Sequence, residues 1–566
     1  MTQSEMGKPW FREYREFGIP ESLRPYPDTP VHEIIEEAAT DYPDAGVVQR
    51  GRTVTYPELH DHVERLATAL RERGVEKGTR VATVLPTSIQ FIVTEHAITR
   101  AGGVHISNDF LDAESDLKYR LEQGNPQVLV GNAENSELLY DLYDELDIEH
   151  LLITEIDDYS TDPPTHDVAP NAEWLVNVIE DTQPNPPDVE FDVESDVHTI
   201  LFTGGTTGRP KGCLLSHRNV LANARQGVAS MSQLAAMLRG SESALLALPI
   251  YHAYGYSVTH SLLDLPVTVL LAPDPRDTKS MVDLIDEQGP VLLFGVPTQF
   301  MDIVDEELDT SVVGISGSAP LASETKESFE RSSTGVSQGY GLSEMSPITH
   351  FDIRGVYEMM LGNAPDDDGL DQPTIGVPVP DTEVKLVDID SGEEIPMARA
   401  IEDGLEGEMY LNGPQRMLGY LDAETSPFDD DGFVPTGDVV RVDEQGRFYV
   451  VDRVKDMINV SGLKVYSEEV DEILFGHEGV RRPATVGVPD PDRPGSELVK
   501  VYVEPDPTYD GDLTADDIRE YLADEVPRHA RPESVEFVEE IPLTAIGKTD
   551  KKQLRERHDG DEATVE

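Results

Sequence analysis

The distribution of apolar positions predicts alternating helices and strands in the first part of the chain. Residues 31–39 and 59–73 carry apolar side chains at helical spacing. Short apolar runs at 81–85, 128–130 and 151–153 are typical of buried parallel strands. Alternation of this kind indicates an α/β fold, in which helices cover the faces of a largely parallel sheet.

The pattern then changes along the chain. Residues 155–196 are rich in Asp, Glu, Pro and Asn, so we expect a solvated connection with a short helix near 174–179. The α/β alternation resumes over residues 197–348. Over residues 374–451 it becomes strand, Gly/Pro turn and strand, which predicts a smaller β-rich unit.

The tail of the chain has an α/β rhythm of its own. Helical and strand-like segments alternate there, at 467–475, 484–488, 499–503, 515–522 and 535–537. The predicted fold class is α/β, with layered α/β subdomains and the β-rich subdomain in a large N-terminal domain and a small mobile α+β domain after it. The predicted bounds of the two domains are 1–454 and 455–566.

Charge is the most unusual feature of the composition. The 566 residues include 110 acidic and 44 basic side chains, a net charge of −66, and only 13 of the basic residues are lysine. An acidic, lysine-poor surface resembles proteins of salt-loving organisms, where a Debye length of about 3 Å at about 1 M salt screens self-repulsion. We therefore expect a protein from a halophilic archaeon. The lack of a basic face argues against nucleic-acid binding.

Several classes of protein are not expected. No window holds eighteen consecutive apolar residues, so no integral membrane segment is predicted, and the N-terminus lacks the apolar stretch of a signal peptide. A single cysteine, Cys213, excludes an internal disulfide and a Cys-rich metal site. These features predict a cytoplasmic protein, and they leave its oligomeric state open, with a homodimer as one candidate.

A glycine- and threonine-rich segment carries the first candidate chemistry. After the apolar run 199–202, residues 203–212 spell Thr-Gly-Gly-Thr-Thr-Gly-Arg-Pro-Lys-Gly. Glycines let backbone N–H groups approach an anion, and hydroxyls and an ammonium add donors, so the loop suits a polyphosphate. It lacks the Gly-Lys-Ser/Thr ending of a Walker loop. The candidate phosphate-binding residues are Thr203, Gly204, Gly205, Thr206, Thr207, Gly208 and Lys211.

This segment resembles the signature of the adenylate-forming (AMP-binding) superfamily, which includes acyl-CoA synthetases, peptide-synthetase adenylation domains and luciferases. Further motifs follow in the order that the superfamily has them, so the resemblance covers roughly residues 30–555. Those motifs lie at residues 249–255, 316–321, 338–344, 413–420, 432–438, 451–462 and 541–548.

The resemblance implies roles for residues of the first motifs. His252, after Tyr251, would line the carboxylate pocket and would, with Lys211, take part in catalysis. The resemblance places Glu344 on Mg²⁺, a role that suits a hard oxygen ligand, and Thr203 would be a second metal ligand. Contacts with adenine, acyl chain and phosphate would come from Ser318, Ala319, Pro320, Gln338, Gly339, Tyr340, Gly341 and Ser343.

The later motifs imply a nucleotide clamp and a moving lysine. Asp438 would accept the ribose hydroxyls, and Arg453 would contact ribose and phosphate. Lys455 falls at the superfamily's hinge between the large and small domains. Two more residues belong to the small domain: Lys548 would be its mobile catalytic lysine, and the segment with Gly462 and Lys464 would lie beside the pantetheine channel.

The implied function is an ATP-dependent ligase that converts a carboxylic acid, ATP and CoA to acyl-CoA, AMP and pyrophosphate through an acyl-adenylate, with Mg²⁺. Gly341 stands where short-chain acetate enzymes carry Trp, and Asp452 resembles the long-chain fatty-acyl branch, so a medium- or long-chain fatty acid is favoured. The alternatives are an aromatic or short-chain acid, a carrier protein as acceptor, luciferase-like oxygenation, or a non-catalytic acyl or nucleotide sensor.

Overall fold

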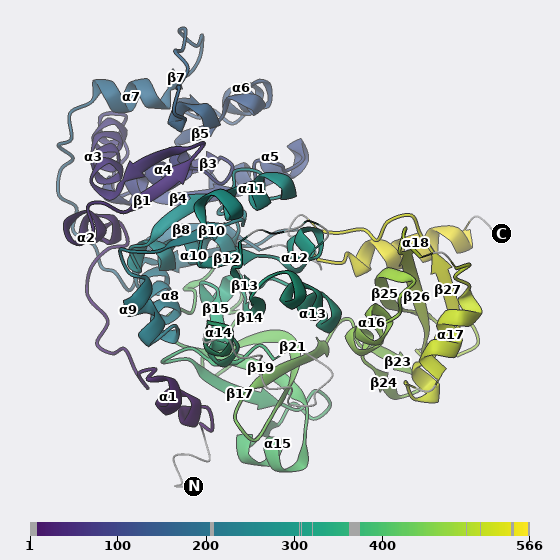
Figure 1. Ribbon diagram of the computed structural model, residues 1–566. Helices are drawn as coiled ribbons and strands as arrows, with labels where there is room; N and C mark the ends of the chain where they lie inside the picture. Colours follow the sequence, from purple (N-terminus) through teal and green to yellow (C-terminus); the bar gives the residue numbers. More distant parts are fainter. Residues whose placement is uncertain are drawn as a thin grey trace.

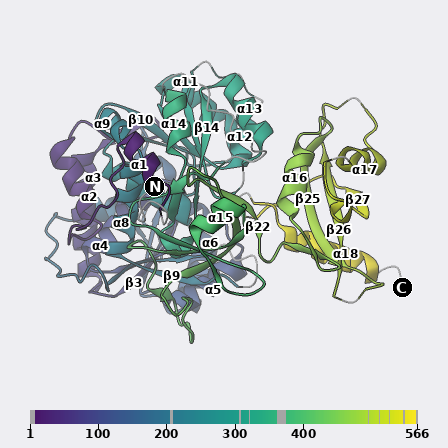
Figure 2. The same ribbon diagram turned by 90° about the horizontal axis from the view of Figure 1, so that it is seen from below.

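The computed structural model describes residues 8–563, except 204–208, 305, 307, 309, 320, 361–373, 494, 510, 524 and 545–547. Its described residues form a large body and a smaller one, which stand side by side in both views (Figures 1 and 2). The large body contains three sheets, and the smaller body contains the last five strands. No helix of the described ranges is long and apolar enough to cross a bilayer.

The first sheet carries the phosphate-loop candidate. It has eight strands in the order β20-β9-β8-β4-β3-β5-β6-β7, and the strands from β8 to β7 are parallel. Their bounds are β3 Arg80–Val84, β4 Val104–Asn108, β5 Val128–Asn132, β6 His150–Thr154, β7 Glu173–Trp174, β8 Val197–Phe202, β9 Gly212–Ser216 and β20 Gly419–Tyr420. The three strands predicted from apolar runs are β3, β5 and β6.

The second sheet has nine strands in the order β16-β15-β14-β13-β12-β10-β11-β1-β2. Its bounds are β1 Gly46–Gln49, β2 Arg52–Thr55, β10 Ser243–Leu246, β11 Thr268–Leu271, β12 Leu292–Gly295, β13 Val313–Ser316, β14 Gly335–Gly341, β15 Ile348–Phe351 and β16 Val377–Pro378. Its central strands are parallel and almost wholly buried, which explains their continuous apolar runs.

Helices between the two sheets make a shared core. In α4 (Ile89–Arg100) every residue but the last is buried, because the helix is enclosed on all sides. It lies in one hydrophobic cluster with α8 (His217–Ser230), α10 (Ala253–Asp264) and side chains of both sheets, such as Val81 and Val269. This cluster holds the two sheets together.

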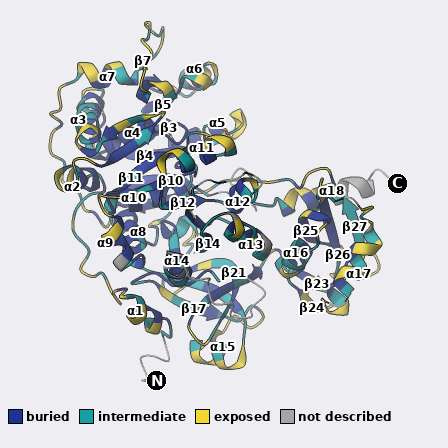
Figure 3. Ribbon diagram, viewed as in Figure 1, coloured by how far each residue is buried: buried dark blue, intermediate teal, exposed yellow. Residues whose placement is uncertain are grey.

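The remaining helices of the large body lie nearer its surface, and most of them have an exposed side (Figure 3). The predicted helices at 31–39 and 59–73 are α2 and α3, and α7 is the short helix predicted near 174–179. Their bounds are α1 Phe11–Phe17, α2 Glu33–Asp41, α3 Tyr56–Glu72, α5 Glu114–Gly124, α6 Ser136–Glu145, α7 Leu175–Asp181, α9 Gln233–Leu238, α11 Thr278–Gln288, α12 Pro297–Val304, α13 Ser323–Ser332 and α14 Ile353–Met360, with short 3-10 helices at Ala133–Asn135, Ile156–Tyr159 and Ser343–Met345.

The predicted β-rich unit is an antiparallel sheet of five strands, ordered β18-β17-β19-β21-β22. Its bounds are β17 Glu383–Val387, β18 Glu394–Ile395, β19 Gly407–Asn412, β21 Val434–Val442 and β22 Phe448–Arg453, with α15 Met397–Asp403 beside it. The side chains of β19 alternate between buried and half-buried, as expected for a sheet with one covered face.

The smaller body pairs a two-stranded ribbon with a three-stranded sheet. Its bounds are β23 Ile458–Val460, β24 Leu463–Val465, α16 Ser467–Phe475, β25 Val480–Pro489, β26 Glu497–Pro505, α17 Ala515–Ala523, the 3-10 helix Arg528–Ala530, β27 Ser534–Phe537 and α18 Lys551–Ala563. The predicted fold class, α/β layers in a large N-terminal domain followed by a small α+β domain, is confirmed.

Candidate active site

The two ends of the glycine-threonine segment are tied together at the mouth of the β8–β9 hairpin. The N–H of Thr203 donates to the carbonyl of Lys211 at 2.9 Å, and the N–H of Lys211 donates to Thr203 Oγ1 at 3.2 Å. The pairing of β8 with β9 therefore fixes the backbone position of Lys211. The predicted phosphate ligands Gly204, Gly205, Thr206, Thr207 and Gly208 lie outside the described residues, as does Pro320.

Lys211 and Glu344 meet at a tyrosine that the sequence did not single out. The Lys211 ammonium lies 5.0 Å from the centroid of the Tyr420 ring, and the Tyr420 hydroxyl donates to Glu344 Oε1 at 2.6 Å. Burial and the Glu344 carboxylate raise the pKa of Tyr420 above its usual value, so the phenol stays protonated. Tyr420 was not predicted as a site residue, because the motif at 413–420 was given no chemical role. The pairing of β20 with β9 places Tyr420 beside Lys211.

Glu344 fits the requirements of a Mg²⁺ ligand. Its backbone carbonyl accepts from Met417 N–H at 2.9 Å, and Tyr420 holds one carboxylate oxygen, so the side chain has a fixed direction. A carboxylate oxygen has more than one lone pair, and Mg²⁺ usually takes one or two carboxylates together with substrate phosphates. Cys213, next to this cluster in β9, is fully buried, and burial raises the pKa of its thiol.

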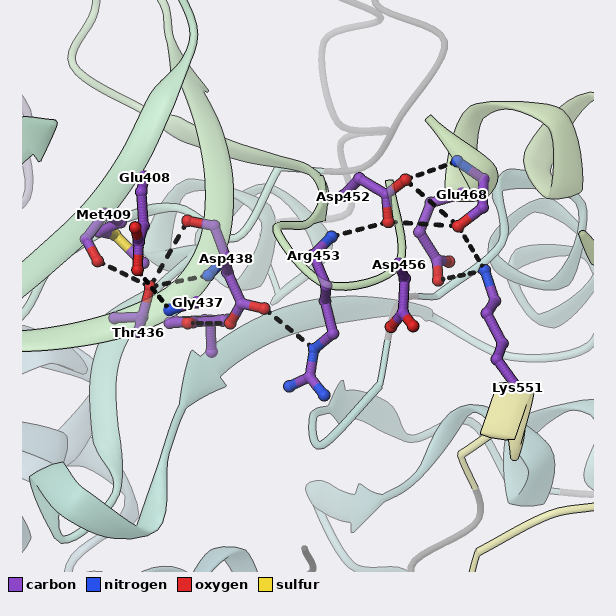
Figure 4. A network of polar contacts seen from close by, with 12 residues as sticks. Glu408, Met409, Thr436, Gly437, Asp438, Asp452, Arg453, Asp456, Glu468 and Lys551 are labelled. Carbon is purple, nitrogen blue, oxygen red and sulfur yellow. Dashed lines mark hydrogen bonds and ion pairs between the residues drawn. The ribbon is translucent and has the colours of Figure 1, made fainter. Parts of the chain in front are cut away.

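Asp438 is held between two of the predicted nucleotide-binding residues. The Tyr340 hydroxyl donates to Asp438 Oδ2 at 2.5 Å, and Arg453 Nε donates to Asp438 Oδ1 at 3.0 Å. Asp438 and Arg453 are direct partners in the register of β21 and β22, and Figure 4 shows the guanidinium reaching back toward the carboxylate. The charge of Asp438 raises the pKa of Arg453. The pair is a fixed donor and acceptor set, as a ribose site requires.

Lys548 comes to this same place from the smaller body. Its N–H donates to Thr544 Oγ1 at 3.1 Å, and its carbonyl accepts from Thr544 N–H at 2.7 Å. Partial burial of Lys548 lowers the pKa of its ammonium to about 8; the charge of Arg453 acts in the same direction and that of Asp438 opposes it. Tyr340, Asp438 and Arg453 thus contact one another, and Lys548 lies within the electrostatic influence of Asp438 and Arg453.

The junction between the two bodies follows Arg453 directly. Residues 454–456 form the turn between β22 and β23, and Val454 N–H donates to the carbonyl of Gly437 at 2.8 Å. Lys455 lies in this turn, where burial and Arg453 lower the pKa of its ammonium. The turn therefore starts within the Asp438–Arg453 cluster.

A second polar network joins the end of β22 to the smaller body (Figure 4). The Asp452 carboxylate accepts from the N–H of Ser467, the first residue of α16, at 2.5 Å. Lys551 of α18 lies 2.8 Å from Ser467 Oγ and 2.9 Å from Glu468. Burial raises the pKa of Asp452 to about 7, and the charge of Lys551 opposes this. Asp452 thus satisfies the first backbone N–H of α16 and joins the two bodies.

His252 has a buried acidic partner. It precedes α10, and its Nε2 lies 3.2 Å from Oδ2 of Asp109, a residue that directly follows β4. Burial disfavours the ionised carboxyl, but the hydrogen bond and charge of His252 outweigh this and lower the pKa of Asp109. Asp109 was not among the predicted site residues; the signal that could have identified it is its position, with Asn108, at the end of a buried parallel strand.

The strand-end loops of the second sheet form the remaining wall. Ser318 has a φ of 76°, and the N–H of Leu321 donates to the Gln338 side-chain oxygen at 3.3 Å, which joins the two predicted segments. At Gly341 a Cβ would lie 2.1 Å from the carbonyl oxygen of Pro347, so no side chain fits there. Ala319 lies next to Ser318 on the first of these loops, Gly339 lies within β14, and Ser343 begins the turn that carries Glu344.

Gly462 and Lys464 lie on the β23–β24 ribbon. Gly462 occupies its turn with a φ of 88°, and Lys464 Nζ is 2.8 Å from Oδ2 of Asp390, in the turn between β17 and β18. The structure therefore does not place Lys464 with Lys548. Lys464 forms an ion pair with Asp390, whereas the charges of Arg453 and Asp438 act on Lys548.

Comparison with known proteins agrees with this arrangement. The profile of the family described as AMP-binding enzyme matches residues 35–421, and that of the AMP-binding enzyme C-terminal domain matches residues 469–548. The chain belongs to the AMP-binding enzyme family. The predicted enzyme class, an AMP-forming acid–thiol ligase, is confirmed at this level.

Two relatives illustrate the range of this family. A long-chain-fatty-acid–CoA ligase of Bacillus subtilis is 30% identical over 97% of this chain and 98% of its own length. A feruloyl-CoA synthase of Amycolatopsis is 30% identical over 91% of this chain and 96% of its own length.

Solved structures share the fold. ATP-bound MatB from Rhodopseudomonas palustris superposes with a TM-score of 0.80 at 24% identity, covering 94% of this chain and 99% of its own. The anthranilate CoA ligase AuaEII in complex with anthranoyl-AMP superposes with a TM-score of 0.82 at 21% identity, covering 95% and 99% of the two chains.

Proposed function

We propose that this AMP-binding enzyme is an ATP-dependent acyl-CoA ligase that activates a medium- or long-chain fatty acid. The observation that carries the proposal is the Asp438–Arg453 pair, joined at 3.0 Å, with Lys548 of the smaller body near enough for both charges to act on its pKa. A lysine that reaches a nucleotide clamp from a separate body fits a two-step ligase, which must later withdraw it.

In the first half-reaction a carboxylate oxygen of the acid attacks the α-phosphorus of ATP, and the bond to pyrophosphate breaks. Asp438 accepts the ribose hydroxyls, and Arg453 donates to ribose and phosphate. The Lys548 ammonium offsets the charge that develops on the phosphoryl oxygens. With its pKa near 8, this ammonium is mostly protonated at neutral pH, so the positive charge is available.

The other candidate residues act around the triphosphate and the acid. Lys211 and the loop that it closes would bind the phosphates, and His252, oriented by Asp109, would orient the incoming carboxylate. Glu344, with Thr203 as a second candidate, would hold Mg²⁺, which when bound supplies further positive charge to the phosphates. Tyr420 fixes the Glu344 carboxylate for this task.

In the second half-reaction the CoA thiol attacks the acyl carbonyl and AMP leaves. We propose that the smaller body, from residue 455 onward, rotates about the turn at Lys455, which removes Lys548 and brings Gly462 and Lys464 beside the pantetheine arm. The position of this turn directly after Arg453 supports the proposal. Rotation of a domain about a few residues is a common route between two catalytic states.

The fatty-acid assignment is supported by the relatives from Bacillus subtilis and Salmonella typhimurium that are named as long-chain-fatty-acid–CoA ligases. An aromatic acid is the second candidate, because the feruloyl-CoA synthase has the same 30% identity over 91% of the chain. The acidic surface supports a salt-loving organism as the source.

Pyrophosphate release tests the proposal. The enzyme is incubated with Mg-ATP in concentrated KCl with acetate, octanoate, palmitate, benzoate or ferulate, with and without CoA. We expect octanoate or palmitate to give multiple turnovers only when CoA is present. Turnover restricted to benzoate or ferulate would favour the second candidate, and no release with any acid would contradict the ligase proposal.

A further inference from the structure

Five ionisable side chains form a buried cluster in the helical layer between the two large sheets. They come from three elements that are labelled close together in Figure 1: α4, β8 and α10. Each is at most 1% exposed. Polar groups buried this deeply are costly unless every one has a partner. The residues are Glu95, His96, His198, Tyr256 and His260.

One carboxylate oxygen is the centre of the cluster. Glu95 Oε1 lies 2.8 Å from His198 Nε2 and 3.4 Å from His260 Nε2, and the Tyr256 hydroxyl lies 2.9 Å away. The ligand atoms of Glu95, His198 and His260 all lie within 4.8 Å of one another. Three atoms that can act as ligands thus converge on one small space.

The hydrogen bonds of His260 place its proton on Nδ1, which leaves no proton on the nitrogen that faces Glu95. Its Nδ1 is 2.8 Å from the carbonyl oxygen of Tyr256, and a carbonyl only accepts, so Nδ1 carries the proton. In the neutral ring Nε2 is then a bare acceptor. It faces Glu95 Oε1, which is also an acceptor, and it has no hydrogen-bond partner among the described residues.

Tyr256 cannot repair this conflict. Its hydroxyl has a single proton and lies 2.7 Å from His198 Nε2 as well as 2.9 Å from Glu95 Oε1. Whichever of these takes the proton, and whichever tautomer His198 adopts, His260 Nε2 receives no donor. A positive charge placed between the three atoms removes the conflict. A second proton on His260 would instead let Nε2 donate to Glu95 Oε1, and the metal content of the protein distinguishes the two arrangements.

We propose that Glu95, His198 and His260 bind a divalent transition-metal ion of the Zn²⁺ type. Two neutral imidazoles and a carboxylate are a known Zn²⁺ ligand set, and bond lengths of about 2.0–2.1 Å place tetrahedral ligands about 3.3 Å apart. The observed separations of 2.8 and 3.4 Å are close to that value. The Tyr256 hydroxyl, 2.7 Å from His198 Nε2 and 2.9 Å from Glu95 Oε1, borders the same space.

The outer contacts of the two histidines suit the same site. His198 Nδ1 lies 3.0 Å from Thr99 Oγ1, and His260 Nδ1 is held by the Tyr256 carbonyl. Metal-bound histidines usually have their second nitrogen fixed in this way, which sets the ring orientation. Both rings therefore direct Nε2 toward Glu95.

A second group of similar composition shows what a satisfied cluster looks like. Glu155, Asp158 and His166 also lie within 4.8 Å of one another. There Asp158 Oδ2 accepts from Thr154 Oγ1 at 2.6 Å and Asp158 Oδ1 lies 2.5 Å from His166 Nε2. Among the described residues, no buried side-chain N or O atom of this second group lacks a hydrogen-bond partner, whereas His260 Nε2 does, so the second group needs no ion.

The proposed site is closed and structural. It joins α4 and α10 to β8, the strand that leads to Thr203, and α10 begins directly after His252. A metal there would fix the relative positions of two segments of the active site without touching the substrate. Its presence is independent of which acid the enzyme activates.

The test is the metal content of untagged full-length protein after equilibration with Zn²⁺ and extensive dialysis. We expect zinc equimolar with the chain by mass spectrometry, and replacement by Co²⁺ should give the visible absorption of a four-coordinate site. Glu95→Gln and His260→Gln should each lower bound metal more than about tenfold. The matched control is His105→Gln, because His105 is equally buried but has Thr83 and Thr199 on its two nitrogens.

Wild-type protein that is folded by circular dichroism, binds no zinc and gives no cobalt spectrum would overturn the proposal. So would a His260→Gln protein that keeps equimolar zinc. The wild-type cobalt spectrum decides the question even when a variant fails to fold. Because neither readout uses activity, a failure of the ligase proposal would leave this result unaffected.

Discussion

Arg453 Nε lies 3.0 Å from Asp438 Oδ1, and the two residues are partners across the β21–β22 ladder. The strand register therefore sets the distance between the proposed ribose acceptor and the proposed phosphate donor. The same two residues define the electrostatic surroundings of Lys548. If the proposed roles hold, nucleotide binding and catalysis both depend on one pair in the five-stranded sheet.

The first prediction concerns this pair. Asp438→Asn should raise the KM for ATP about 10- to 100-fold, because hydrogen bonds to a charged group contribute about 1.5–3 kcal/mol. The measurement is initial rate against ATP concentration. Asp443→Asn is the matched control: it breaks the ion pair with Arg447 in the β21–β22 hairpin, where Arg447 Nε lies 2.8 Å from Asp443, and should leave the KM for ATP unchanged. An equal effect of both variants would contradict the ribose role.

The second prediction separates the half-reactions. Lys548→Ala should lower acyl-adenylate formation about 10²–10³-fold, the usual effect of removing a charge-stabilising donor. It should leave CoA transfer from preformed acyl-adenylate intact. Quenched single-turnover assays with each starting material measure the two steps. Lys552→Ala is the control, because Lys552 is an exposed lysine of the neighbouring helix. Unchanged ATP-dependent adenylation in Lys548→Ala would refute the role.

The third prediction is a pH profile. Lys548 acts in its charged form, and its pKa is lowered to about 8, so adenylation should be constant below that pH and decline above it. The profile of kcat/KM for ATP reports the free enzyme and is the quantity to measure. In Lys548→Arg the decline near pH 8 should disappear, since a guanidinium does not lose its proton there. A decline that persists in this variant must come from another group.

The fourth prediction concerns the hinge. Lys455→Pro should allow adenylate to form but slow its transfer to CoA, because proline restricts the backbone at the turn about which the smaller body would rotate. Pyrophosphate burst size and acyl-CoA formation are measured on the same sample. Thr508→Pro, in the exposed loop after β26, is the control, because it places a proline outside the turn at Lys455. Equal loss of both half-reactions would show that the hinge lies elsewhere.

The fifth prediction follows from the net charge of −66. Lowering KCl from about 2 M to dilute buffer lengthens the Debye length from a few ångströms to tens of ångströms, so repulsion among acidic side chains should destabilise the fold. Thermal melting at a series of salt concentrations should show a falling Tm. A Tm that does not change with salt would contradict the halophilic interpretation.

The sequence by itself determined the order of helices and strands, because burial imposes the same apolar periodicity whatever the neighbouring elements are. It placed β3, β5 and β6, and it identified a β-rich segment at 374–451 that the structure shows as the five-stranded sheet. It also selected Asp438, Arg453 and Lys548 as one functional set through local motifs. These features depend on residues close together in the chain.

Only the tertiary structure decided the partners of these groups. Tyr420 reaches Glu344 across 76 positions of sequence, and Asp109 meets His252 across 143. Glu95, His198 and His260 converge from three separate elements. No local pattern encodes such contacts, because they depend on strand order and on which helices the two sheets enclose.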